Sequence, residues 1–131
     1  MSETQEAKEA KHAVNWFEIP VSQIERAAKF YSDIFDIKME KQEWQGVKMA
    51  FFPGGGKDTV HGALVQGEGY TPSDKGTLVY LNGSPDLSAA LSRVEKAGGK
   101  VVKPKFAIGE HGFIAYFTDT EGNKVALHSM Q

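Results

Sequence analysis

The sequence predicts an α+β domain made of two similar halves, each ordered as a strand, a helix and three further strands. Three observations support this fold class. Two segments have apolar residues at helical spacing, several short runs alternate apolar and polar residues, and the order of these segments repeats along the chain. The chain has 131 residues, of which 40% are apolar and 24% are charged. This size and composition are typical of one globular domain.

The first half begins with a strand that is predicted from alternation. In the run "WFEIPV", Phe17, Ile19 and Val21 lie on one face, and Trp16 and Glu18 lie on the other. The run therefore predicts a strand with two chemically different faces.

An amphipathic helix follows this strand. The run "SQIE" predicts a capping box, with Ser22 as the N-cap and Glu25 as its partner. The buried stripe is expected to contain Ile24, Ala27, Ala28, Tyr31, Ile34 and Phe35. Strands are then predicted at 38–44, 47–52 and 60–66, and the Gly- and Pro-rich run "GEGYTPSDKG" (67–76) is the predicted linker.

The second half has the same order. A strand is predicted at 77–82, and a helix is predicted to follow with Ser84 as N-cap and Pro85 as its first residue. The pair Gly98-Gly99 is expected to end this helix. The remaining strands are predicted near 100–103, 113–118 and 124–129.

Short sequence matches support an internal repeat. "GALV" at 62–65 aligns with "VALH" at 125–128, and "MAFF" at 49–52 aligns with "IAYF" at 114–117. The offsets are 125 − 62 = 63 and 114 − 49 = 65 residues, so the hairpins differ by two residues. Because the order of elements agrees and the offsets are nearly equal, we expect two copies of one structural unit.

Composition excludes several classes of function. The net charge is −2 with both signs interspersed, so there is no electrostatic argument for nucleic acid or an anionic membrane as a partner. The chain has no cysteine, which excludes disulfides, thiolate catalysis and cysteine zinc sites. No apolar run has the length of a membrane span, and a cytoplasmic protein is expected. Residues 1–13 are polar and are expected to form a flexible tail.

The chain resembles the vicinal oxygen chelate superfamily, which includes glyoxalases, bleomycin-resistance proteins and extradiol dioxygenases. The resemblance rests on "WFEIPVSQIERAAKFYSDIF", "GTLVYLN", "VEKAGGKVV" and "FTDTEGNKVAL", and it covers one domain at 14–131. It implies modules at 14–66 and 77–130 that form a curved eight-stranded mixed sheet. A ligand cavity would occupy the concave face and the helices the convex face, with Trp16 and Glu18 turned toward the cavity.

The resemblance also implies four cavity positions at which enzymes of the family usually place His, Glu or Gln as metal ligands. These positions correspond here to Trp16, Ala63, Val79 and Ala126, although alternation favours Leu78 over Val79. None of these side chains can coordinate a divalent cation. We therefore expect neither a bound metal nor another cofactor.

Three polar residues are the candidate catalytic groups: Glu18, His61 and His128. The two histidines are expected to point into the cavity, where they could bind a ligand, act as acid and base, or form an improvised metal site. They could equally be solvated residues at strand ends. Glu18 could act as a general base, pair with Lys48 or Lys124, or reach water.

The other candidate ligand-binding residues are aromatic. Tyr80 could orient a ligand through its hydroxyl group, and Trp16 and Phe52 could provide a stacking surface or simply pack. Tyr70 in the linker could act as a lid or lie on the surface. His111 is expected in a turn near the cavity rim.

Two functions remain open from the sequence. The first is a protein that binds a small aromatic or amphipathic molecule without chemistry, as in the bleomycin-resistance branch. The second is a metal-independent isomerase or lyase that uses Glu18 or a histidine as general base. A homodimer is expected in either case, because family members are often dimers and because "GALV" and the first strand of each half offer open sheet edges.

Overall fold

The computed structural model describes residues 12–131 of the chain. Residues 1–11, which make up most of the predicted tail, lie outside the described part. The described residues form two βαβββ modules with one four-stranded mixed sheet each, which confirms the α+β fold class.

The first module contains β1 (Trp16–Pro20), α2 (Ile24–Phe35), β2 (Glu40–Trp44), β3 (Val47–Phe51) and β4 (His61–Gln66). Its sheet has the strand order β1-β4-β3-β2. Strand β1 runs parallel to β4, and the other neighbouring pairs are antiparallel.

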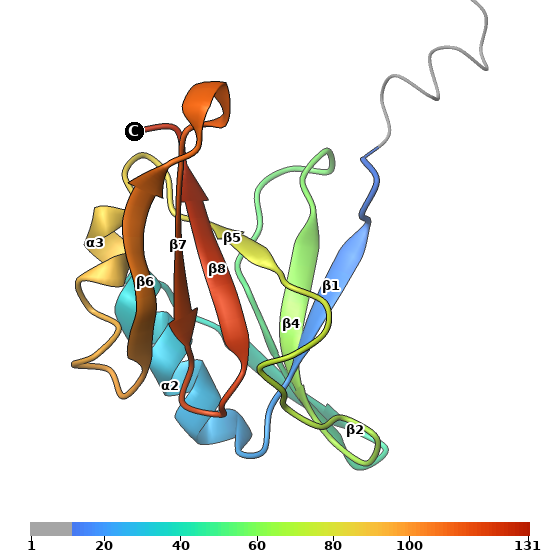
Figure 1. Cartoon of the computed structure of the whole chain (residues 1–131). Helices are drawn as coiled ribbons and strands as arrows, with labels where there is room; N and C mark the ends of the chain where they lie inside the picture. The colour runs from blue at the N-terminus through green and yellow to red at the C-terminus, as the bar shows by residue number, and fades with distance from the viewer. Residues whose placement is uncertain (1–11) are drawn as a thin grey trace, which may run out of the picture.

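The second module contains β5 (Tyr80–Asn82), α3 (Ser88–Leu91), β6 (Lys100–Ala107), the 3-10 helix η1 (Gly109–His111), β7 (Phe113–Thr118) and β8 (Lys124–Ser129). Its strand order, β5-β8-β7-β6, repeats that of the first sheet, with β5 parallel to β8. Figure 1 shows the two sheets side by side, with α2 and α3 behind β6 and β7.

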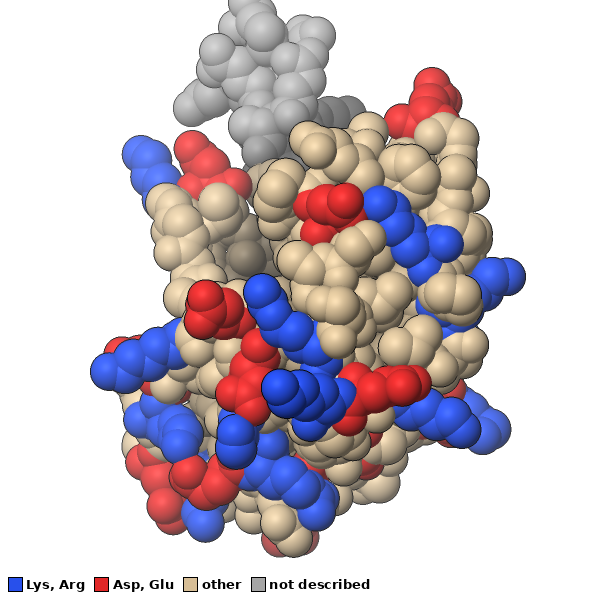
Figure 2. Space-filling model, turned by 90° about the vertical axis from the view of Figure 1, so that its left-hand side faces the viewer, with Lys and Arg blue, Asp and Glu red and all other residues tan. Residues whose placement is uncertain are grey.

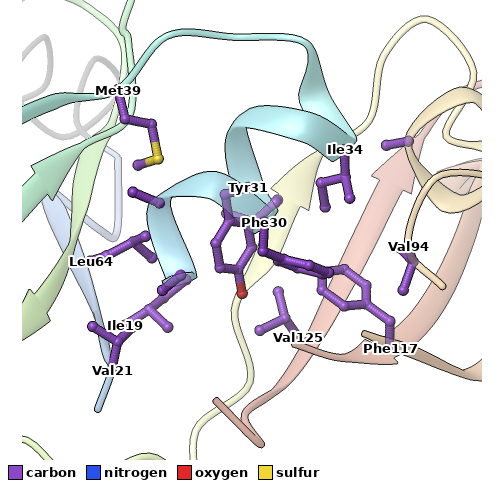
Figure 3. Packing of buried hydrophobic residues seen from close by; sticks show 14 of the residues in the cluster. Ile19, Val21, Phe30, Tyr31, Ile34, Met39, Leu64, Val94, Phe117 and Val125 are labelled. Carbon is purple, nitrogen blue, oxygen red and sulfur yellow. The ribbon is translucent and has the colours of Figure 1, made fainter. Parts of the chain in front are cut away.

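One hydrophobic core joins the two modules through α2. The Phe30 ring lies 5.8 Å from the Phe117 ring in β7, and the Tyr31 ring lies 5.5 Å from the Phe52 ring next to β3. Figure 3 shows Phe30 and Tyr31 reaching from α2 toward Phe117 and Val125 of the second sheet. The helix therefore packs on both sheets at once.

The buried face of α2 agrees with the predicted stripe except at two positions. Its buried residues are Ile24, Ala27, Ala28, Phe30, Tyr31 and Ile34. Phe30 was not predicted because it lies beside the stripe, where it faces the second sheet. Phe35 was predicted to be buried and is half-buried.

The predicted capping box is wrong. Helix α2 begins at Ile24, and its N-cap Gln23 makes no cap hydrogen bond through its side chain. The amides of Ser22 and Gln23 instead donate to Oε1 of Glu121, both at 2.9 Å. The Ile24 amide donates to Oε1 of Gln66 at 2.7 Å. Partners that are distant in sequence therefore satisfy the start of this helix.

The predicted second helix starts too early and is too long. It begins at Ser88, because Oδ1 of Asp86 accepts the Ser88 amide at 2.9 Å. The Leu87 amide donates to Oγ of Ser129 at 2.9 Å, which ties this turn to the end of β8. Residues 92–98 continue as hydrogen-bonded turns.

The linker is longer than predicted, because the strand predicted at 77–82 is reduced to β5. The linker contacts the turn before β8. The Ser73 amide donates to Oδ1 of Asn123 at 2.9 Å, and the Lys124 amide donates to the Ser73 carbonyl at 3.4 Å.

One of the predicted sheet edges is not an edge. The run "GALV" lies in β4, which is hydrogen-bonded to β1 on one side and to β3 on the other. The terminal strands are β1 and β2 in the first sheet and β5 and β6 in the second. The first strand of each half is therefore an edge, as predicted.

Charges of both signs are interspersed over the side of the molecule that carries α3 and β6. Figure 2 shows blue and red side chains next to one another over the lower part of this face and fewer of either over the upper part. No helix among the described residues has the length and apolar character needed to cross a membrane.

Candidate ligand-binding site

Each sheet has one face on the hydrophobic core and an opposite face, named here the open face. In the first sheet, Trp16 pairs with His61 and Glu18 pairs with Ala63, so these four residues share the open face. Ile19 points the other way and is buried in the core. The predicted alternation of β1 is confirmed, and Trp16 keeps 43% of its surface exposed.

The open face of the second sheet carries Tyr80, Ala126 and Tyr116, which are neighbours across β5, β8 and β7. Leu81 is buried in the core and Val79 packs against it. Tyr80, which is 46% exposed, therefore occupies the open face of this strand. Val79 faces the other way and lines the hollow described next.

A hollow of about 240 Å³ lies between β1 of the first sheet, β8 of the second sheet and the linker, and part of its lining comes from the core-facing residues Ile19, Val79 and Val125. Glu18 lines it from β1, Lys124 lines it from β8, and Thr71 and Thr77 line it from the linker. Drug-sized ligands usually occupy about 300–1,000 Å³. The hollow can therefore hold a small molecule or the polar end of a larger one.

Glu18 is exposed and held by two neutral donors. Its Oε2 accepts a hydrogen bond from Nε1 of Trp16 at 3.2 Å, and its Oε1 accepts one from the Tyr70 hydroxyl at 3.2 Å. The negative charge of Glu18 raises the pKa of Tyr70. Among residues 12–131, neither Lys48 nor Lys124 forms an ion pair with Glu18.

Three rings cover much of the open face of the second sheet, and we name Tyr80, Phe106 and Tyr116 the aromatic wall. The Tyr80 and Tyr116 rings lie 6.4 Å apart with their hydroxyls 3.5 Å apart, and the Phe106 ring lies 6.0 Å from Tyr116. Two ammonium groups lie over these rings. Nζ of Lys103 is 4.6 Å from the Phe106 centroid, and Nζ of Lys124 is 4.7 Å from the Tyr116 centroid.

The sequence identified only Tyr80 in this group. Phe106 was not predicted because it lies beyond the predicted strand at 100–103, where β6 shifts register between Val101 and Lys103 and again between Lys103 and Phe106. Simple alternation cannot be followed through such irregularities. Tyr116 lies in the regular strand β7 opposite Ala126, so alternation could have identified it.

Phe52, for which the sequence left both a stacking role and simple packing open, packs in the core. Its ring packs on Phe17 at 5.6 Å and on Tyr31 at 5.5 Å, which places it in the core. Phe51 occupies the open face and lies 6.1 Å from the Trp16 ring. Two adjacent phenylalanines at the end of a strand point to opposite faces, and the sequence analysis identified only Phe52 as a candidate.

Ala63 and Ala126 lie on the open faces but have no exposed surface. Ala63 is paired with Glu18 and Phe51, and Ala126 is paired with Tyr80 and Tyr116. These larger neighbours cover the two methyl groups. Neither alanine therefore offers surface to a ligand in this structure.

The two candidate histidines each contact a loop at the end of their sheet. Nε2 of His61 lies 3.1 Å from Oγ1 of Thr59. Nε2 of His128 donates to the carbonyl oxygen of His111 at 2.6 Å. His111 lies in η1, in the predicted connection before β7, and contributes this carbonyl to the contact.

The side chains at this site do not fit a divalent metal ion. The described residues contain no group of three or more His, Asp or Glu side chains close enough to share one ion. Glu18, His61 and His128 accordingly do not converge. Trp16 and Ala63, at two of the implied ligand positions, have no donor atom for a metal.

A buried turn between β7 and β8 connects the modules. Asp119 accepts a hydrogen bond from the Tyr31 hydroxyl at 2.7 Å and others from the amides of Glu121 and Asn123. Nδ2 of Asn123 donates to the Pro20 carbonyl at 2.7 Å. Burial, and then the charge of Asp119, raise the pKa of Tyr31 well above its ordinary value. The turn "DTEGN" is therefore a structural joint that also positions β8 beside the hollow.

Comparison with known proteins identifies the family. Residues 13–127 match the model of the Glyoxalase/Bleomycin resistance protein/Dioxygenase superfamily. The chain belongs to this superfamily, which confirms the resemblance in the sequence.

Individual relatives agree with this assignment. A glyoxylase-like domain-containing protein from Didymella fabae is 34% identical over 123 residues, which is 87% of this chain and 91% of the relative. A mutant of glyoxalase I from Zea mays has a similar fold, with a TM-score of 0.65 and 22% identity. That match covers 88% of this chain but only 45% of the maize chain. TnmS3, an antibiotic binding protein from Streptomyces sp. CB03234, matches with a TM-score of 0.61 and 23% identity over 92% of this chain and 97% of its own.

Proposed function

We propose that the protein binds a small aromatic or amphipathic molecule between its open faces without using a metal ion. The observation that carries the proposal is the pair of exposed aromatic residues, Trp16 and Tyr80, on the two open faces. Neither ring lines the hollow, but Glu18 on the face of Trp16 and Val79 next to Tyr80 do. Aromatic surface that stays exposed in the free protein favours stacking with a planar ligand. The similarity to an antibiotic binding protein supports the same class of function.

Saturation-transfer NMR with a panel of small aromatic compounds tests this proposal. Replacing Trp16 or Tyr80 by alanine should weaken binding by about three- to tenfold, the loss expected for one aromatic contact. Trp44→Ala is the matched control, because Trp44 is 72% exposed on the edge strand β2. Equal effects of Trp16→Ala and Trp44→Ala would contradict a site at the hollow.

A metal-independent isomerase or lyase is the second candidate function. The observation in its favour is Glu18, an exposed carboxylate that lines the hollow beside the Tyr70 hydroxyl. A base at this position would exchange a ligand proton with solvent. Incubation of bound ligands in deuterium oxide should then show deuterium incorporation that Glu18→Gln abolishes, whereas a pure binding protein shows none in either form.

We also propose that the protein is a homodimer. The outer strands β1, β2, β5 and β6 leave unpaired backbone groups along four edges, and proteins usually cover such edges. Light scattering at micromolar concentration should give twice the chain mass of 14.4 kDa. A mass equal to that of one chain would contradict the dimer.

A further inference from the structure

The two sheets differ in the charge of their strands. The strands of the second sheet read YLN, KVVKPKFA, FIAYFT and KVALHS and contain no Asp or Glu. In the first sheet, Glu18 and Glu40 lie on the open face, where they pair with Ala63 and Phe51. The aromatic wall is therefore on the positively charged side of the site.

Two lysines of the second sheet lie over rings, and neither forms an ion pair within the described part of the chain. Nζ of Lys103 and Nζ of Lys124 approach the aromatic wall at 4.6 and 4.7 Å. Lys124 does influence the carboxylate of Asp74, whose pKa is lowered chiefly by a hydrogen bond from Lys75 and in smaller part by the charge of Lys124. An ammonium group over a ring keeps its N–H donors available to an acceptor from solvent or from a ligand.

Lys124 also lines the hollow, together with Thr71 and Thr77. Lys124 therefore borders both the aromatic wall and the hollow. Because its ammonium group lies over one face of the Tyr116 ring, a ligand ring that contacts Tyr80 and the edge of Tyr116 would place a substituent next to Nζ of Lys124.

Glu18 lines the same hollow from the opposite sheet, so the hollow has a carboxylate on one side and the ammonium group of Lys124 on the other. Like charges repel and opposite charges attract across a short distance. A negative substituent is thus favoured beside Lys124 and disfavoured beside Glu18.

We propose that the ligand is a planar aromatic anion whose ring lies against Tyr80 and Tyr116 and whose negative group lies beside Lys124. This inference rests on the proposed binding function and adds the charge and orientation of the ligand. A carboxylate or sulfonate joined directly to an aromatic ring has the required chemistry.

Three probes with the same ring system separate the effect of charge from that of stacking: 1-naphthoate, 1-naphthalenemethanol and 1-naphthylmethylammonium. Their binding can be followed through Trp16 fluorescence in a Trp44→Phe background and confirmed by calorimetry. The anion should bind about tenfold more tightly than the neutral alcohol, the ratio expected for a hydrogen bond to a charged group. The cation should bind most weakly.

Variants of Lys124 assign the preference to one residue. Lys124→Met should remove the advantage of the anion over the alcohol, and Lys124→Arg should retain the advantage. Lys29→Met is the control, because Lys29 pairs with Asp33 on the exposed side of α2.

The outcomes distinguish the two proposals. Three results would overturn the charge inference: equal binding of all three probes, tightest binding of the cation, or an equal loss of affinity for anion and alcohol in Lys124→Met. Each of these results would still support the aromatic binding function. Failure of all three probes to bind would contradict the binding function itself.

Discussion

Glu121 has a central role at the scale of single residues, because it belongs to the second module but stabilises a helix of the first. Its side chain is fully buried and accepts hydrogen bonds from the Ser22 and Gln23 amides and from Nε of Arg26 at 2.7 Å. Burial alone raises the pKa of Glu121. The hydrogen bonds from Arg26, Gln23, Thr120 and Ser22 outweigh this effect and lower the pKa to about 2.

Replacing Glu121 by glutamine should destabilise the protein by about 1.5–3 kcal/mol, the range for hydrogen bonds to a charged group. Chemical denaturation measures this free energy of unfolding. The control is Glu25→Gln, which removes an exposed ion pair with Lys41 and should cost less than about 1 kcal/mol. Equal stability of Glu121→Gln and the wild type would contradict the account of this joint.

The lowered pKa of the Glu121 carboxylate predicts that the free energy of unfolding depends on pH. The pKa of Glu121 in the folded protein, about 2, is lower than its ordinary value of 4.5. Its contribution is therefore complete above pH 4.5 and is lost as the pH falls from 4.5 through 2. Between these pH values the stability of the wild type should fall more steeply than that of Glu121→Gln. Parallel curves would show that Glu121 is not the group responsible.

The positions of the candidate catalytic residues predict that the protein has no tight metal site. Because Glu18, His61 and His128 do not converge, chelator-treated protein should show no stoichiometric submicromolar site for zinc, nickel or manganese in calorimetric titration. A site of that strength that disappears in His61→Ala or His128→Ala would overturn this prediction.

At the scale of elements, the start of α2 shows why local sequence can mislead. Ser22 fits a capping box, but its amide is satisfied by Glu121, which is 99 residues away along the chain. A pattern within four residues cannot reveal such a partner. The turn "DTEGN" was recognised as a family motif, but its hydrogen bonds to Tyr31 and Pro20 depend on tertiary structure.

This geometry predicts that replacing the apparent cap residue Ser22 costs little stability, whereas replacing the distant residue Gln66 costs more. Ser22→Ala should change the free energy of unfolding by less than about 0.5 kcal/mol, because the N-cap is Gln23 and the contact of Ser22 with Glu121 uses its backbone amide, which alanine keeps. Gln66→Ala should cost about 1 kcal/mol or more, because it leaves the Ile24 amide without its acceptor. Urea denaturation measures the free energy of unfolding of the two variants. A larger loss of stability in Ser22→Ala than in Gln66→Ala would support the capping box predicted from the sequence.

Strand positions were predictable because alternation and turn residues are local signals, and all eight strands lie within predicted segments or overlap them. The faces of strands were predictable only where alternation is clear. Trp16 and Glu18 were placed correctly on β1, whereas Phe51 was not identified and Phe52 packs in the core. In the aromatic wall, Tyr80 and Tyr116 lie on regularly paired strands, but the position of Phe106 depends on the irregular register of β6, which local spacing does not reveal.

At the scale of the whole molecule, the two modules share one core and one hollow. Helix α2 packs on both sheets, and Glu18 of the first module lies across the hollow from Lys124 of the second. The repeated module thus provides two similar open faces that have diverged in sequence. One carries Trp16 with acidic residues, and the other carries the aromatic wall with lysines.

The central claim is that these open faces bind an aromatic ligand without a metal ion. Isothermal titration calorimetry of the full chain with 1-naphthoate, in the presence and absence of a chelator, tests it most directly. The account predicts saturable binding of one ligand per chain, unchanged by the chelator and weakened by either Trp16→Ala or Tyr80→Ala. Binding that requires an added divalent ion, or that persists unchanged in both variants, would contradict it.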